Sequence, residues 1–250
     1  MNSATMSLII FVCVFGGALL GLLLHAILPE HHLSKETQDI VKLGMGLVGT
    51  MAALVLGLLV ASAKGSYDAQ SAEVAQLSAN IALIDRALAL YGPETKEVRA
   101  VLHGAVSRTL DQMWPKAASV TPSVPKSSGG EILYEKIHAL APQNDTQRSL
   151  KSQASSIAVD LAKTRWLMYA QAMSSVSLPL LVILVLWLSA IFISFGLFAP
   201  INATTVSSLF VAALSVSCAI FLVLEMYTPY TGLVQISSAP LRAAIAQLGQ

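Results

Sequence analysis

Few side chains in this sequence have the types and the spacing that chemistry at a site requires. His25, His31 and His32 come close together in the chain, and three imidazoles could bind a transition metal. Their spacing matches no standard metal site, so we interpret them as surface-loop histidines and predict no metal site. Cys13 and Cys218 both lie in apolar stretches, which is typical of apolar packing and not of a disulfide framework.

Nothing in the sequence favours an enzyme. It contains no nucleophile and histidine pair, no phosphate-binding glycine loop and no zinc-ligand spacing, and its carboxylates are spread along the chain as solvated charges are. We therefore predict no catalytic residue and no cofactor. Asn202-Ala203-Thr204 fits the glycosylation pattern, but the segment is short and close to an apolar stretch. A helix N-cap at Asn202 or Thr204 is the better interpretation.

Four apolar stretches must position whatever site exists, and they span residues 7–28, 43–63, 178–199 and 204–224 without any Asp, Glu, Lys or Arg. Crossing a hydrocarbon core of ~30 Å takes about 20 helical residues, so each stretch is long enough. The composition agrees, with 55% hydrophobic and 12% charged residues among the 250. The sequence predicts an all-α integral membrane protein with four transmembrane helices, the first of them a retained span.

The charged residues lie mainly between the second and third spans. Residues 64–177 hold 12 of the 15 Lys and Arg and 10 of the 14 Asp and Glu, a balance too mixed to favour nucleic acid. Basic residues next to the spans are more numerous on the side of this block, which predicts that it is cytoplasmic. The expected layout is 1–63 for spans 1 and 2, 64–177 for a helical cytoplasmic domain, 178–224 for spans 3 and 4, and 225–250 for a tail.

The block from 64 to 177 has the periodicity of packed helices. Its first helix should continue directly from the second span, because apolar residues recur every three or four positions between Val74 and Tyr91. Gly92 and Pro93 then predict a helix end and a new helix that runs to about Met113. We expect a mobile loop over 114–130, a short helix, and a long helix capped by Asp145 that runs without a break into the third span.

The tail after the fourth span should turn and then form a short amphipathic helix. Thr228-Pro229-Tyr230-Thr231-Gly232 has turn-forming residues, and Ser238 is a plausible cap for a helix whose Leu241 and Ile245 share one face. This tail should pack under the helical domain.

Small residues form a stripe on the second span. Gly49, Ala53, Gly57 and Ala61 recur at every fourth position, with Thr50 as the one polar side chain before Ser62. In lipid, such stripes allow helix backbones to approach each other closely. Two interpretations stay open: packing within one subunit, or a surface that faces another subunit or a pore.

Charges at the ends of the spans form a second candidate set: Lys64, Asp68, Arg165 and Glu225. Glu225 is the one carboxylate that directly adjoins the fourth span, and an unpaired carboxylate in a partly dry interface is costly. It could pair with Lys64 or with Arg165, or it could be a solvated charge at a helix end.

Several segments resemble a bacterial family of unknown function that is described as bestrophin-like. The resemblance covers essentially the full chain, and the segments that carry it are 57–68, 83–94, 199–204, 224–232 and 237–241. They include the turn residues Gly92, Pro93, Asn202, Pro229 and Gly232.

This resemblance implies a function. Bestrophins are pentameric anion channels with four spans, cytoplasmic termini and a large helical cytoplasmic region, so we expect a homo-oligomer in the bacterial inner membrane, in contact with lipid, that conducts chloride or other small anions through a pore around the second span. The neck residues and the acidic calcium clasp of bestrophins are not matched here, and no calcium site is predicted. The alternative is a non-conducting scaffold or sensor whose cytoplasmic helices bind a partner.

Overall fold

The computed structural model describes residues 3–29, 33–115, 130–172, 177–230 and 232–248. These residues are helical, without a strand in the ranges described, and the chain forms two compact units. Unit 1 comprises residues 1–65 and 175–227, and unit 2 comprises residues 66–174 and 228–250. His31 and His32, together with most of the predicted 114–130 loop, lie outside the described residues.

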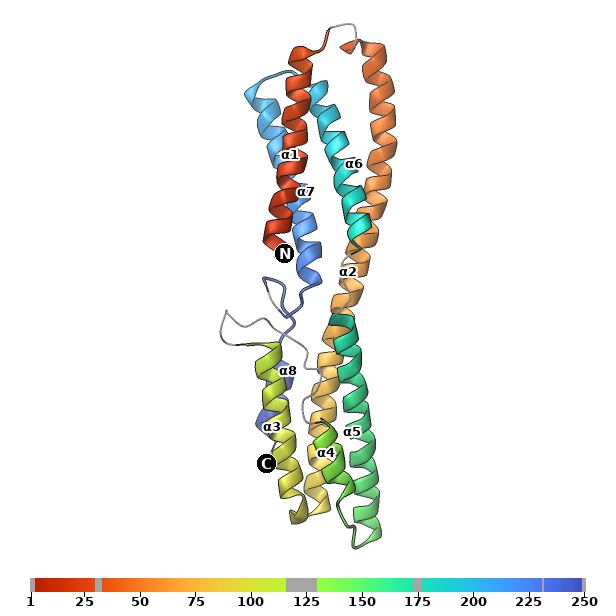
Figure 1. The fold of residues 1–250 in the computed structure, drawn as a ribbon, viewed down its shortest axis with the longest axis vertical. Helices are drawn as coiled ribbons and strands as arrows, with labels where there is room; N and C mark the ends of the chain where they lie inside the picture. Colours follow the sequence, from red (N-terminus) through yellow and green to blue (C-terminus); the bar gives the residue numbers. More distant parts are fainter. Residues whose placement is uncertain (1–2, 30–32, 116–129, 173–176, 231, 249–250) are drawn as a thin grey trace. The chain divides into compact units, whose positions relative to one another are not determined.

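Unit 1 is a bundle of apolar helices in which α1 (Ser3–Ile27) packs along α6 (Leu178–Leu197) and α7 (Ala203–Met226) (Figure 1). These three helices, and α2 (Lys35–Tyr91), are each long and apolar enough to cross a membrane. The rings of Phe11, Phe15 and Phe210 pack together between α1 and α7, with centroids 5.4–5.6 Å apart. The four apolar helices that the sequence predicts are therefore present.

Glycines set the close contact between α1 and α6. A Cβ at Gly21 would collide with the backbone oxygen of Ile193, and a Cβ at Gly196 would collide with that of Ala18. Only residues without a side chain permit this approach, which is the role that small residues have in membrane helix packing. His25 strengthens the same pair of helices, because its Nδ1 lies 2.8 Å from the backbone oxygen of Leu197.

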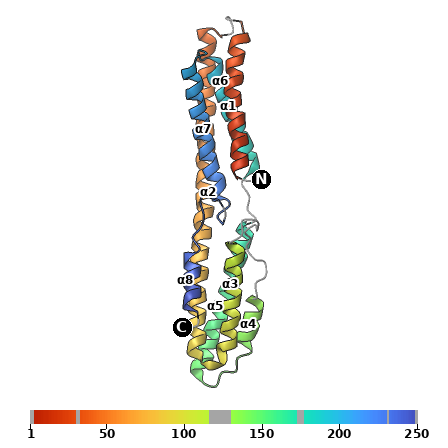
Figure 2. The same ribbon diagram turned by 90° about the vertical axis from the view of Figure 1, so that its left-hand side faces the viewer.

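Unit 2 packs the second part of α2 with α3 (Lys96–Met113), α4 (Gly130–His138), α5 (Asp145–Ala172) and α8 (Ala239–Gln247) around one apolar core (Figure 2). The predicted seam is confirmed, because its residues are at most 4% exposed: Val74, Leu77, Ile81, Ile84, Leu88 and Tyr91. The tail also packs on this unit as expected. Leu241 of α8 is fully buried, and α8 contacts α3.

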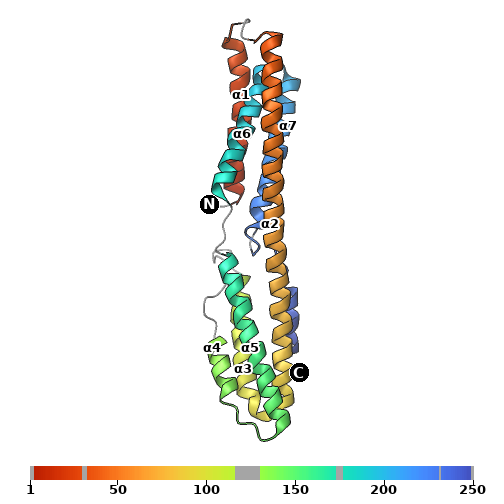
Figure 3. The ribbon, with the colours of Figure 1, turned by 90° about the vertical axis from the view of Figure 1, so that its right-hand side faces the viewer.

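The prediction that the first helix of this unit continues from the second apolar stretch is confirmed. α2 is one helix of 57 residues (Figure 3). It ends at Tyr91. Gly92 follows with a φ of 135°, which suits glycine, and a short 3₁₀ helix, η2 (Pro93–Thr95), leads into α3. The Thr95 hydroxyl donates to the backbone oxygen of Leu88 at 2.6 Å and so fixes this corner.

Three local expectations are wrong. His25, which we interpreted as a surface-loop histidine, lies within α1 and is half-buried. The helix from 145 does not run unbroken into the third apolar stretch, because Ser177 is extended and α6 starts at Leu178. Pro179 explains the start, since a proline has no N–H to donate and fits only the first turn of a helix. The cap of α5 is Asn144 and not Asp145: the Asn144 Oδ1 accepts from the backbone N–H of Gln147 at 2.8 Å.

Candidate functional site

The candidate site is the surface of the membrane-length part of α2, because the rest of the described chain covers little of this surface. In the most apolar stretch of this helix 11% of the residues are buried, against 33% in α1 and α6 and 28% in α7. The side that does pack inward carries Ala52, Leu59 and Ala63, which are 0–4% exposed. The other sides of the helix leave large apolar side chains such as Leu47 and Leu54 exposed.

The predicted stripe lies on the uncovered side. Ala53, Gly57 and Ala61 are exposed, and a Cβ at Gly57 would meet no atom of the described residues within 4 Å. Gly49 is the nearest to a neighbour, with the Ile191 Cδ1 at 3.9 Å from its Cβ position. Close packing within one subunit, the first of the two open interpretations, is therefore not the role of Gly57 in this structure.

Thr50 adds little polarity to this surface. Its hydroxyl donates to the backbone oxygen of Leu47 at 2.7 Å, within its own helix. A helical threonine with its hydroxyl bonded in this way presents mainly its methyl group to the outside. The surface around the stripe is therefore apolar, with small residues that allow another helix or an ion path to come close.

The charges at the ends of the spans have different surroundings. Glu225 is buried, 6% exposed, although Lys64 and Asp68 are exposed. Arg165 lies in unit 2, where burial lowers the pKa of its guanidinium and the charge of Glu131 opposes this shift. The proposed pairing of Glu225 with Lys64 or Arg165 stays a prediction.

The turn residues in the family-like segments occupy positions that need their chemistry. Asn202 caps α7 as predicted, with its side chain accepting from the backbone N–H of Thr205 at 2.7 Å. Gly92 and Gly232 have φ angles of 135° and 81°, and they are the residues with positive φ in the described ranges. The Pro229 oxygen accepts from the Ile236 N–H at 2.8 Å and closes the turn of the tail.

Unit 2 contains a polar cluster that the sequence did not indicate, formed by the half-buried Glu73 of α2 and Gln171 of α5 and by the buried Tyr230 of the tail. The Gln171 Nε2 donates to the Glu73 Oε1 at 2.5 Å. The Tyr230 ring is 9% exposed and meets Trp114 edge-on, with centroids 5.4 Å apart. Within the described residues, three buried oxygens of the cluster have no hydrogen-bond partner: Glu73 Oε2, Gln171 Oε1 and Tyr230 Oη.

Burial explains how this cluster titrates. It raises the pKa of the Glu73 carboxyl, and the hydrogen bond from Gln171 opposes that shift. Burial also raises the pKa of the Tyr230 phenol, and the nearby charge of Glu73 raises it further. Glu73 and Gln171 are 98 positions apart in sequence, and Tyr230 comes from the tail. No local pattern could therefore have revealed the cluster.

The glycine contact between α1 and α6 was also missed, although a signal was present. Gly17 and Gly21 form a Gly-x-x-x-Gly motif inside an apolar stretch, which is a known helix-pairing pattern. We predicted close helix packing only for the second span, because its stripe of small residues is longer.

A comparison with known families and proteins places this architecture. The family model described as a bestrophin-like domain matches residues 12–241, nearly the full chain. No curated protein and no solved structure matches it. The match includes most of α1, the other three apolar helices and the helical unit between them, in agreement with the resemblance of the turn segments. The chain therefore belongs to the Bestrophin-like family.

Proposed function

We propose that this bestrophin-like membrane protein assembles into a ring of identical subunits that conducts small anions, with α2 closest to the central path. The observation that carries the proposal is the exposure of α2: 11% of its most apolar stretch is buried by the chain itself. A contiguous apolar surface that one chain leaves open marks an interaction site. Lipid or further copies of the chain must cover this surface.

The stripe supports further copies as neighbours of α2. Residues without large side chains let helices approach closely in a membrane, where packing and not hydrophobicity drives association. Cyclic symmetry would place the same face of α2 in every subunit around one axis. A path lined in this way would be mostly apolar, and apolar constrictions gate ion flow by excluding water. Five subunits are expected by analogy with bestrophins.

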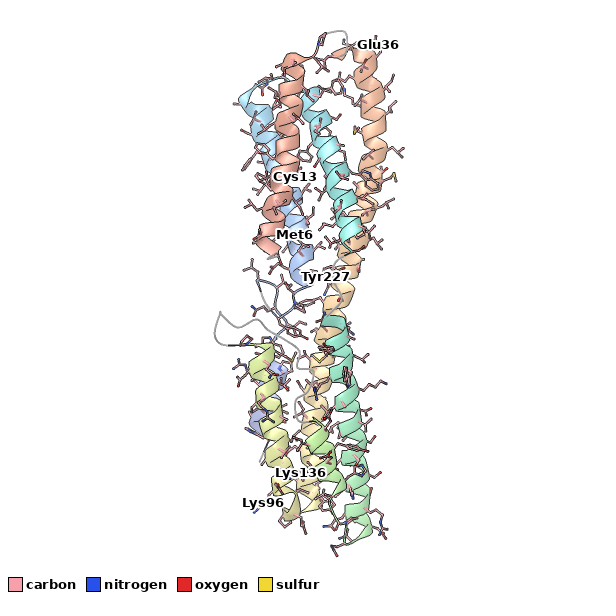
Figure 4. All side chains as sticks on the ribbon, in the orientation of Figure 1. Met6, Cys13, Glu36, Lys96, Lys136 and Tyr227 are labelled. Atoms are coloured by element: carbon pink, nitrogen blue, oxygen red, sulfur yellow. The ribbon has the colours of Figure 1, made fainter. Side chains whose placement is uncertain are left out.

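The orientation follows from the basic residues. Lys64, Lys163, Arg165 and Arg242 adjoin spans on the side of unit 2, and Lys35 and Lys42 lie at the other ends. This excess favours a cytoplasmic unit 2 and cytoplasmic termini in a bacterial inner membrane. Two single-cysteine variants test this orientation, with the cysteine at Glu36 (Figure 4) or at Ser149. Both positions are exposed, and both variants are made in a protein lacking Cys13 and Cys218. A membrane-impermeant thiol reagent should label Glu36→Cys alone in intact cells, and labelling of Ser149→Cys alone would reverse the topology.

Conduction is tested with the purified protein in liposomes. We expect chloride flux that depends on the protein, together with a detergent-solubilised complex whose mass is a whole multiple of 26.4 kDa, corrected for bound detergent. Absence of flux over a range of pH and calcium concentrations would favour the non-conducting scaffold or sensor. A monomeric mass with intact folding would contradict the ring.

A further inference from the structure

A groove of about 810 Å³ lies within unit 1, where the first turns of α2 face the end of α6 and the start of α7. It is open on one side and is not an enclosed cavity. Its lining from α2 includes Gln38, Lys42, Met45 and Gly49. The lining from α6 and α7 combines apolar and hydroxyl-bearing side chains: Ile191, Ser194, Phe195, Phe198, Ala199, Asn202, Thr204, Thr205, Ser208 and Leu209.

The charge of the groove has one sign. Among the described residues that line it, Lys42 is the single cation and none is an acid. Asp39 lies three positions away on α2, yet no ion pair joins it to Lys42 in the described residues. Opposite Lys42, α7 begins at Ala203, and the first turn of a 24-residue helix carries partial positive charge. The groove is therefore electrostatically complementary to an anion.

A hydroxyl group in the lining of the groove provides a separate argument for a ligand. Ser194 is 8% exposed and lines the groove, but its hydroxyl makes no hydrogen bond within the described part of the chain. Hydroxyls elsewhere in the helices of unit 1 donate back to their own helix, as Ser215 of α7 does to the Val211 oxygen at 2.8 Å. The hydroxyl therefore keeps its donor and acceptor capacity for a polar group of a ligand in the groove.

The groove also changes polarity along its length. On α2, Gln38 and Lys42 come first, and Met45 and Gly49 follow one and two turns further into the apolar stretch. On α7, Asn202 and Thr204 precede Leu209 in the same sense. One end thus suits a charged group at the depth of lipid headgroups, and the other suits hydrocarbon.

We infer that this groove binds one anionic phospholipid, whose phosphate lies between Lys42 and the start of α7 and whose acyl chain lies over Gly49 and Ile191. A single-sign polar end joined to an apolar end matches an amphiphile better than it matches a free anion. The inference requires that the four helices span a bilayer, as proposed above, but it does not require conduction. It assigns a lipid class to a site and not merely to the membrane surface.

Native mass spectrometry of the full-length delipidated protein tests this inference. Dioleoyl phosphatidylglycerol should bind more tightly than dioleoyl phosphatidylcholine. Lys42→Gln should weaken phosphatidylglycerol binding about tenfold, since a charge-assisted hydrogen bond contributes ~1.5–3 kcal/mol. Lys35→Gln is the matched control, because Lys35 is exposed on the same helix and does not line the groove. Equal losses in the two variants would show general surface attraction and would overturn the site.

A second pair of variants tests the apolar end. Gly49→Leu should fill the groove and weaken phosphatidylglycerol binding, whereas Gly44→Leu, at a position with no atom within 4 Å that does not line the groove, should not. Glycerol 3-phosphate should not compete, and full competition would mean that a free anion is the ligand. Efficient disulfide formation between copies of a Met45→Cys variant in a cysteine-free background would show that a second copy covers the groove, which overturns the lipid.

Discussion

Residues 66–91 of α2 bury an apolar seam against their own chain, whereas residues 43–63 of the same helix leave most of their surface open. Ile84 and Leu88 in the first of these regions are 0% and 1% exposed. Leu54 and Leu58 in the second are 75% and 60% exposed. Both regions have helical periodicity, so periodicity alone did not decide which one found a partner within the chain.

The difference lies in what each region is built to contact. The seam of unit 2 carries large aliphatic side chains, which gain stability when they leave water and pack on α3 and α5. The stripe of unit 1 carries glycine and alanine, which gain little from leaving lipid and are useful only where a second backbone comes close. Gly21 and Gly196 bring such a backbone to α1, whereas none of the described residues brings one to Gly57 of α2.

The largest expected effect comes from the seam. Ile84→Ala should lower the free energy of unfolding of the helical unit by about 2–5 kcal/mol, because a fully buried isoleucine leaves a cavity. Leu83→Ala is the matched control, since Leu83 is the adjacent residue and is 53% exposed. Thermal unfolding followed by circular dichroism in detergent measures both. Equal losses would mean that this seam is not the contact that holds unit 2 together.

The next effect comes from the covered glycine of unit 1. Gly21→Leu should destabilise the bundle by about 3 kcal/mol, the upper end for overpacking, because its side chain would meet the backbone of α6. Gly16→Leu on the same helix should be nearly neutral, since a Cβ at Gly16 meets no atom within 4 Å. The melting temperature of the purified variants distinguishes them. A Gly21→Leu protein that melts like the parent would contradict the close α1–α6 contact.

The uncovered glycine of α2 should behave differently. Gly57→Leu should leave the fold of each subunit intact and weaken association between copies about tenfold, as expected for a lost contact of ~1.4 kcal/mol. Leu58→Ala, on another face, is the milder control. Light scattering of the detergent complex reports the number of copies. An unchanged mass at low protein concentration would show that the stripe is not in close contact with another copy.

The sequence was sufficient for the features that depend on local pattern. Apolar length identified four helices, three- and four-residue spacing identified the seam, and Gly92, Pro93 and Asn202 were recognised from the conformations that they favour. Each of these features depends on residues within one or two turns of one another. A single chain's pattern is enough to specify them.

Contacts between distant segments were beyond such reasoning. The stripe on α2 and the motif at Gly17 and Gly21 look alike in sequence, and only the packed structure shows that one is covered and the other is not. The cluster of Glu73, Gln171 and Tyr230 joins two helices and the tail, which the folded topology alone brings together. The break before α6 has a local signal in Pro179, but the continuous apolar pattern across this region favoured one unbroken helix.

The smallest effect concerns that cluster, at the end of the well-covered region of α2. The pKa of Glu73 is raised in the folded state, mainly by burial, so the folded protein binds its proton more tightly than the unfolded chain. Stability from this group is therefore greatest below the unfolded pKa and declines as the pH rises through the folded pKa.

Glu73→Gln keeps an oxygen that can accept from the Gln171 Nε2 and removes the buried charge. At pH 7 the free energy of unfolding of the variant should be higher by less than about 1 kcal/mol after solvent screening. Its melting temperature should rise slightly as a result. At pH 4 the two proteins should converge. Gln76→Glu, which adds a charge at an exposed position one turn away, should not reproduce this pH dependence. If Glu73→Gln is less stable than the parent at pH 7 and equal to it at pH 4, the ionised carboxylate stabilises the polar cluster. The covered region of α2 would then depend on a charged contact as well as on the burial of its apolar seam.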